Sequence, residues 1–239
     1  MRICLCFLGL ARTFEATHST IIQQTMDANH TYSVVYVTWE SENTEIFEKI
    51  FPNAMIVKIP DVNQESPYFL SWKEGLQMHI SWRRSYDPSY ALFRYFQQIY
   101  LWNQAALLLE QHQDKFDIMV RLRTDITYSQ SITPFYTQVF EEERPIVFFS
   151  GNTQQHILFE GQSCPDQFFL AKPGTFLTTL QVLQHIHTYR INYLETKRKW
   201  FPIDTWERNI VQPESILFYY VKGNRMDVCY LPIEISIHR

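Results

Sequence analysis

Runs of apolar residues alternate along this chain with segments in which apolar residues recur every three or four positions. Runs of about four to eight apolar residues are typical of strands buried on both faces, and the recurring spacing is typical of amphipathic helices. The runs predict strands at residues 2–8, 32–39, 54–59, 116–123, 145–150, 167–171 and 226–231. The periodic segments predict helices at residues 15–30, 44–51, 72–84, 88–113, 174–193 and 213–221.

The first of these elements follow the order strand, helix, strand, helix, strand. This order indicates an α/β fold with a mostly parallel central sheet flanked by helices, as in Rossmann-like domains. The sequence contains no internal repeat, low-complexity tract or Gly/Ser-rich linker. We therefore expect a single domain over residues 1–239.

The strongest helical pattern covers residues 88–113. Asp87 is a suitable cap for this helix, and Pro88 suits its first turn. The stripe expected to face the sheet consists of Leu92, Phe96, Ile99, Asn103, Ala106 and Leu107.

Composition narrows the class of protein. Of the 239 residues, 46% are hydrophobic and 19% are charged, which excludes a disordered chain. The net charge of −4 provides no overall attraction to nucleic acid, so we expect no nucleic-acid partner. The sequence also lacks a GxxxxGK[ST] loop, which argues against a P-loop enzyme.

The cysteines and the N-terminal segment indicate in which cellular compartment the protein is expected. Cys4 and Cys6 lie two apart on a predicted strand, where their Cβ atoms are too far apart for a disulfide, and no zinc-binding spacing occurs. We expect four buried thiols, including Cys164 and Cys229, and a cytoplasmic protein. The apolar run at residues 2–8 is short for a signal peptide, and no run reaches the roughly 18 residues of a membrane span.

Ligands of open α/β sheets bind beyond the carboxyl ends of the parallel strands. This rule selects residues 9–13, 38–40 and 121–125. The last segment is the most informative, because the strand period of two puts Arg121, Arg123 and Asp125 on one face. The trio is either an ion network that braces the sheet or a site for an anionic ligand, with Mg²⁺ or Mn²⁺ on Asp125.

The segment FDIMVRLRTDI at residues 116–126 resembles the yDivvRxRxDl signature of small GT-A-type glycosyltransferases of bacterial polysaccharide loci and large DNA viruses. Gly9 and Arg12 are similar to the start of that family, and the VYVTW run at residues 35–39 is similar to its second strand. The resemblance covers about half of the chain. The wider class has Asp-x-Asp at this strand end, whereas this chain has Arg123, Thr124 and Asp125, so Arg123 is able to neutralise part of a diphosphate charge itself.

The resemblance implies a GT-A-like domain that transfers a sugar from a nucleotide-diphosphate sugar to a glycan or a lipid-linked acceptor. Residues 1–126 would form the nucleotide-binding half and residues 127–239 the acceptor-side half. The implied cofactor is Mn²⁺ or Mg²⁺ on Asp125. Among the histidines of the sequence, His156 and His238 are the candidates to complete a metal shell. An alternative is a non-catalytic module that binds a nucleotide sugar or a glycan.

The resemblance also implies roles for individual residues. Asp125 would hold the metal or the sugar hydroxyls. The residue expected to act as general base for the acceptor hydroxyl is Asp166, with Glu160 and Glu214 as alternates. Both an inverting and a retaining stereochemical course stay open. The basic segment at residues 195–200 is either a solvated helix end or a contact for an anionic acceptor or a peripheral membrane surface. The residues expected to contact the nucleotide sugar are Gly9, Arg12, Thr38, Trp39, Arg94, Arg121, Arg123 and Asp125. A core aromatic is the alternative for Trp39, and a surface charge on the helix before the strand is the alternative for Arg94.

Overall fold

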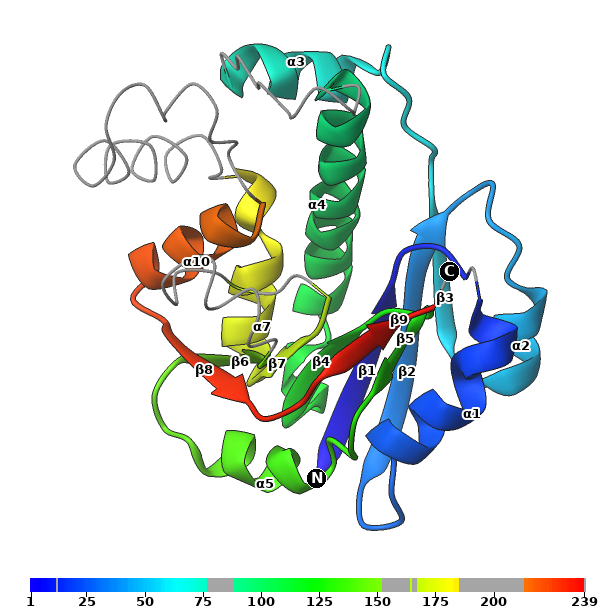
Figure 1. Ribbon diagram of the computed structural model, residues 1–239, viewed down its shortest axis with the longest axis vertical. Helices are drawn as coiled ribbons and strands as arrows, with labels where there is room; N and C mark the ends of the chain where they lie inside the picture. Colours follow the sequence, from blue (N-terminus) through cyan, green and yellow to red (C-terminus); the bar gives the residue numbers. More distant parts are fainter. Residues whose placement is uncertain (12, 77–87, 152–163, 165–166, 185–212, 239) are drawn as a thin grey trace.

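The structure, a computed structural model, describes residues 1–11, 13–76, 88–151, 164, 167–184 and 213–238 (Figure 1). Its elements in chain order are β1 (Arg2–Leu8), α1 (Phe14–Thr25), β2 (Thr31–Trp39), α2 (Glu45–Ile50), β3 (Met55–Ile59), α3 (Pro67–Leu76), α4 (Pro88–Glu110), η1 (Gln113–Lys115), β4 (Ile118–Leu122), β5 (Ile126–Tyr128), α5 (Pro134–Glu141), β6 (Ile146–Ser150), β7 (Phe169–Ala171), α7 (Pro173–Leu180), α10 (Pro213–Gly223), β8 (Asp227–Leu231) and β9 (Ile235–Ile237).

A seven-stranded sheet with the order β3-β2-β1-β4-β7-β6-β8 forms the centre of the described structure. Strands β1 to β4 pair in parallel, and β6 is parallel to β8. Strand β7 lies antiparallel between β4 and β6. The prediction of an α/β fold with a mostly parallel central sheet is therefore confirmed.

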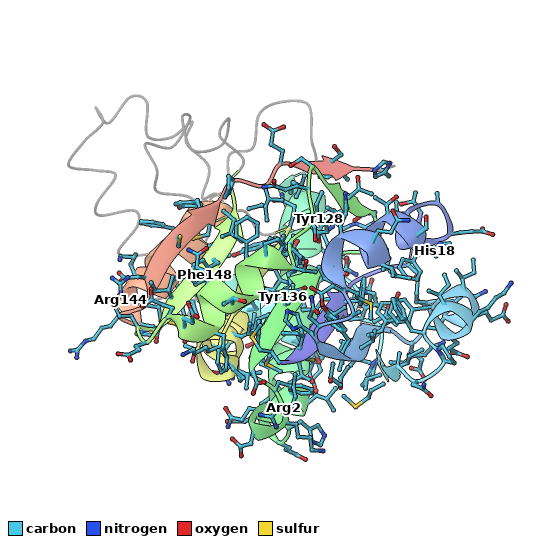
Figure 2. All side chains as sticks on the ribbon, turned by 90° about the horizontal axis from the view of Figure 1, so that it is seen from below. Arg2, His18, Tyr128, Tyr136, Arg144 and Phe148 are labelled. Carbon is cyan, nitrogen blue, oxygen red and sulfur yellow. The ribbon has the colours of Figure 1, made fainter. Side chains whose placement is uncertain are left out.

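Helices cover both faces of this sheet because side chains of a strand point alternately to opposite sides. Cys4, Cys6 and Leu8 of β1 belong to a buried cluster that includes residues of α3, α4, α7 and α10. Ile3, Leu5 and Phe7 belong to a second cluster with residues of α1, α2 and α5. Tyr136 of α5 and Phe148 of β6, both labelled in Figure 2, are part of this second cluster. The fold therefore has three layers, in which the sheet lies between two layers of helices and one buried cluster fills the space on each side of it.

Helix α4 lies along one face of the sheet (Figure 1), and its buried stripe differs in part from the predicted one. Phe96, Ile99, Asn103 and Ala106 are buried as predicted, whereas the side chain of Leu107 is 46% exposed. The stripe runs instead through Trp102, Ala105 and Leu109, which are three and four positions apart and share the face that packs in the buried cluster. None of the helices in the described ranges is both long enough and apolar enough to cross a membrane.

The four cysteines are free thiols. Cys4, Cys6 and Cys164 are buried as predicted, but Cys229 is only partly buried, because it lies in β8 at the edge of the sheet. The Sγ atoms of Cys4 and Cys6 are 3.5 Å apart, which is a contact between thiols and not a disulfide. Burial is the main reason that the pKa of the Cys6 thiol is raised well above its usual value, so this thiol stays protonated and inert.

Three short elements were not predicted, namely α5 and the strands β5 and β9, which pair antiparallel in a separate two-stranded sheet. The pairing brings the C-terminal strand beside the segment that follows β4. The chain therefore closes on the end of β4, where the candidate residues lie. The helix predicted at 72–84 begins earlier, at Pro67. Of the helix predicted at 174–193, the part beyond residue 184 lies outside the described residues.

Candidate functional site

The carboxyl ends of β1, β2 and β4 meet at one edge of the sheet, since these strands are parallel neighbours. Gly9 follows β1 directly, and its φ of 125° lies in a region that residues with a Cβ rarely adopt. Its backbone N–H donates to the carbonyl of Val37 in β2 at 3.2 Å. The chain therefore turns away from the sheet edge at Gly9 and leaves room beyond β1.

Arg121 occupies the middle of the sheet and is only 2% exposed. Its guanidinium lies over the indole ring of Trp102 in α4, with the Cζ atom 4.9 Å from the ring centroid. A cation over an aromatic face is attracted by the ring quadrupole, and the attraction grows when both groups are desolvated. Helix α4 and strand β4 thus hold a buried positive charge near the carboxyl end of β4, a central strand of the sheet.

Arg123 and Asp125 form a bidentate ion pair just after β4. Nε of Arg123 donates to Oδ1 of Asp125 at 2.8 Å, and NH2 donates to Oδ2 at 2.7 Å. The side chains are 30% and 11% exposed, so the pair is partly shielded from water. Arg123 and Asp125 therefore bind each other at the mouth of the candidate ligand site, as the ion-network interpretation of this strand end predicts.

The segment that carries this pair is fixed by its neighbours. The Thr124 hydroxyl donates to the Leu10 carbonyl, and the Thr17 hydroxyl donates to the Thr124 carbonyl at 2.6 Å. On the other side, the backbone N–H of His238 donates to the Asp125 carbonyl at 2.8 Å. Three separate parts of the chain therefore set the position of residues 123–125.

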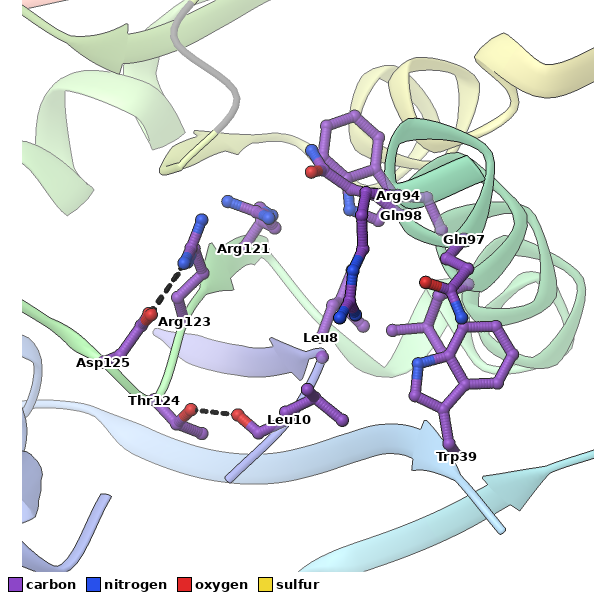
Figure 3. A pocket seen from close by; sticks show the side chains of 13 residues that line it. Leu8, Leu10, Trp39, Arg94, Gln97, Gln98, Arg121, Arg123, Thr124 and Asp125 are labelled. Atoms are coloured by element: carbon purple, nitrogen blue, oxygen red, sulfur yellow. Dashed lines mark hydrogen bonds and ion pairs between the residues drawn. The ribbon is translucent and has the colours of Figure 1, made fainter. Parts of the chain in front are cut away.

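These residues line a pocket of about 220 Å³ between the sheet edge and α4. Figure 3 shows Arg121, Arg123 and Asp125 on one side of it and Arg94, Gln97 and Gln98 of α4 on the other. Among the lining side chains that the structure describes there are three guanidinium groups and one carboxylate, so the pocket favours anions. The described lining consists of Leu8, Gly9, Leu10, Trp39, Arg94, Gln97, Gln98, Leu101, Trp102, Arg121, Arg123, Thr124 and Asp125.

The positive charge reaches beyond the pocket wall to Tyr128 in β5. Burial raises the pKa of the Tyr128 phenol above its usual value, while the charges of Arg121 and Arg123 act in the opposite direction. Tyr128 belongs to the buried cluster on the α1 face of the sheet. Its phenol therefore stays protonated.

The pocket brings together most of the residues proposed to contact a nucleotide sugar, but not all of them. Trp39 lines the pocket and stacks on Tyr100 of α4 with a centroid distance of 6.3 Å. Thr38 is fully buried and is not among the lining residues, because alternation along β2 directs it away from the face that carries Trp39. Arg12 and Asp166 lie outside the described residues.

Sequence analysis missed the contribution of Trp102 and Gln97. Both lie on α4 near Arg94, which was predicted to reach the ligand. The signal was available in the helical spacing, because residues three, four, seven and eight positions apart share a face. Trp102 follows Arg94 by two helical turns and continues the face that Arg94 begins.

The described part of the chain holds no cluster of three His, Cys, Asp or Glu side chains suited to a metal ion. Asp125 supplies the one carboxylate of the described lining, and both of its oxygens accept hydrogen bonds from Arg123. The Nε2 atom of His238 lies 2.9 Å from the hydroxyl of Thr127, and His156 and Glu160 lie outside the described residues. These described residues do not fit a shell for Mg²⁺ or Mn²⁺, which prefer several oxygen ligands.

No protein-family model and no curated protein matches the sequence. The structure is similar to that of mouse xyloside xylosyltransferase 1 in its apo form, with a TM-score of 0.50 and 10% identity, over 97% of this chain and 85% of the mouse chain. It is also similar to an active-site mutant of LgtC, with a TM-score of 0.48 and 11% identity over 96% and 72% of the two chains. The likeness to the mouse protein extends over nearly all of the chain and confirms the GT-A-like fold class.

Proposed function

We propose that this protein is a glycosyltransferase that moves a sugar from a nucleotide-diphosphate sugar to a glycan or a lipid-linked acceptor. The observation that carries the proposal is the gathering of Arg94, Arg121 and Arg123 with Asp125 in one pocket at the carboxyl edge of the parallel strands. Ligands of open α/β sheets bind at this edge. The fold is also shared with a protein whose name describes the transfer of xylose.

The chemistry of transfer explains why arginines suit this place. As the glycosidic bond breaks, the nucleoside diphosphate leaves with additional negative charge. Guanidinium groups that are already in position stabilise this developing charge, and they do so most effectively where water is excluded. Arg121 is buried and held by Trp102, so its position does not have to be established during the reaction.

The rest of the pocket suits the other parts of such a donor. The turn at Gly9 lets the backbone approach a phosphate closely, and Trp39 offers an apolar surface to the base or the ribose. We retain Arg12 as a phosphate contact and Asp166 as the base for the acceptor as predictions from the family resemblance. The Mn²⁺ or Mg²⁺ that the resemblance implies is left out of the proposed function, because the one carboxylate of the described lining, Asp125, is paired with Arg123.

A second candidate is a module that binds a nucleotide sugar or a glycan without transferring it. The observation that favours this candidate is Arg123 at the position where the Asp-x-Asp signature has its first acid. Cytoplasmic location, peripheral association with a membrane and a role in polysaccharide synthesis likewise stay predictions under either candidate.

A thermal-shift screen with nucleoside diphosphates and nucleotide sugars tests the shared premise of both candidates. A ligand that binds only the native state raises the melting temperature by mass action. We expect at least one nucleoside diphosphate or nucleotide sugar to raise the melting temperature. The absence of a response to every compound would remove the transferase and the nucleotide-sugar-binding module. Measuring the release of nucleoside diphosphate from the responding nucleotide sugar then separates them, because only the transferase turns the donor over.

A further inference from the structure

The carboxylate of Asp125 is committed to a neighbouring cation from its own chain. Both of its oxygens accept charge-assisted hydrogen bonds from the Arg123 guanidinium, at 2.8 Å and 2.7 Å. A divalent ion on this carboxylate would have to displace that guanidinium or share the oxygens with it. Bidentate pairs between arginine and a carboxylate are among the stronger hydrogen-bonded contacts in proteins.

The surroundings of Asp125 also oppose a divalent ion. Arg121 and Arg123 both lie on its side of the pocket (Figure 3), and Arg121 is 2% exposed, so water screens its charge little. An added cation would therefore meet two like charges and gain one carboxylate that is already paired. Asp125 is the one carboxylate of the described lining.

The arginine side chains of the pocket are suited to bind and neutralise a diphosphate, which is the role that a divalent cation would otherwise serve. The planar guanidinium groups form paired hydrogen bonds with phosphate oxygens and stay charged at any ordinary pH. Arg121 and Arg123 approach from the end of β4, and Arg94 approaches from α4 on the opposite wall. A diphosphate between these walls would be held from two sides.

We propose that this pocket binds the diphosphate of its donor through arginine side chains and needs no divalent cation, with Asp125 acting as a positioning residue for Arg123. This inference rests on the proposed function. It departs from the metal ion that the family resemblance implies, and it follows from the ligand geometry around Asp125.

The first experiment measures binding to the 239-residue chain with and without metal. UDP, GDP, ADP, CDP and dTDP are titrated by calorimetry in excess EDTA and again in saturating Mn²⁺. We expect one of them to bind with dissociation constants that agree within about threefold between the two conditions. Titration of Mn²⁺ alone, followed by electron paramagnetic resonance, should show no bound ion at the protein concentrations used.

The second experiment changes the residue that departs from the signature. Arg123→Asp removes the guanidinium and restores two acids at this strand end, so we expect binding of the diphosphate to become dependent on Mn²⁺. Arg123→Gln keeps a polar side chain but removes the charge and the reach of the guanidinium, so it should weaken binding in both conditions. Arg144→Asp is the matched control, because Arg144 is exposed and pairs with Glu142 and Asp227 instead of lining the pocket.

The outcomes separate this inference from the proposed function. Tight binding in Mn²⁺ together with its loss in EDTA would overturn the inference and leave the transferase proposal standing. Failure of every nucleoside diphosphate to bind under both conditions would overturn the transferase proposal, and the inference with it. Unchanged binding in both folded Arg123 variants, checked by circular dichroism, would also overturn the role assigned to this arginine.

Discussion

Substitution of Asp125 by Ala removes the partner that holds Arg123 in place, and it separates the functional role of this carboxylate from its structural one. Two charge-assisted hydrogen bonds are lost from a pair whose side chains are 30% and 11% exposed. Exposed pairs contribute roughly 0.2–1 kcal/mol, and breaking a buried pair costs about 3–5 kcal/mol. The exposure places this pair between those limits, so we expect a loss of about 2 kcal/mol.

For a chain of this length, that loss lowers the melting temperature by about 4–8 °C. The fold should persist, because the hydrogen bonds that anchor residues 123–125 come from backbone groups and from Thr124 and Thr17. Donor turnover, measured as release of nucleoside diphosphate, should fall at least about a hundredfold, the scale seen when a preorganised polar group is removed from an active site.

Asp117→Ala is the control for this experiment. Asp117 lies at the opposite end of β4 and forms an ion pair with Arg2 at 2.7 Å, outside the pocket. This variant also loses an Asp–Arg pair but should retain donor turnover. Full turnover in a folded Asp125→Ala variant would refute the assignment of this pocket as the active site.

Three further predictions concern stability. Gly9→Ala should lower the free energy of unfolding by about 1–3 kcal/mol in urea titrations, because φ is 125° while no atom lies within 4 Å of the added Cβ, so the cost is backbone strain alone. Trp102→Leu should lower it by about 3 kcal/mol through lost packing and lost contact with Arg121, and Trp102→Phe should cost less because it keeps an aromatic ring there. Burial raises the pKa of Tyr32 to about 12, so the folded state favours the neutral phenol. The contribution of Tyr32 to the free energy of unfolding is therefore complete below about pH 10 and is lost as the pH rises toward 12. A Tyr32→Phe variant should show a smaller decline in melting temperature over this alkaline range.

Much of the fold could be predicted because it depends on local pattern. The run at residues 2–8 is apolar at nearly every position, and it forms β1 in the interior of the sheet. The strand period of two was sufficient to predict that Arg121, Arg123 and Asp125 lie on one face. The pocket lining confirms that these three side chains lie together.

Short and non-local elements could not be read in this way. Strands β5 and β9 have three residues each, too few to show a period, and the residues that pair are far apart in the sequence, as Ile126 and Ile237 are. The stripe of α4 was misplaced at Leu107 because the sequence contains apolar residues on more than one side of this helix. Only the packing against the sheet decides which side is buried.

The sequence by itself determined the α/β class and the strand end at which charged residues gather, because hydrophobic spacing and strand period act between near neighbours. Tertiary structure alone decided that Arg94 of α4 faces Arg121 and Arg123, that Trp102 supports Arg121, and that Arg123 binds Asp125. Such contacts depend on the distance between elements and on the angle at which they pack, and neither quantity is encoded in the pattern of any single segment.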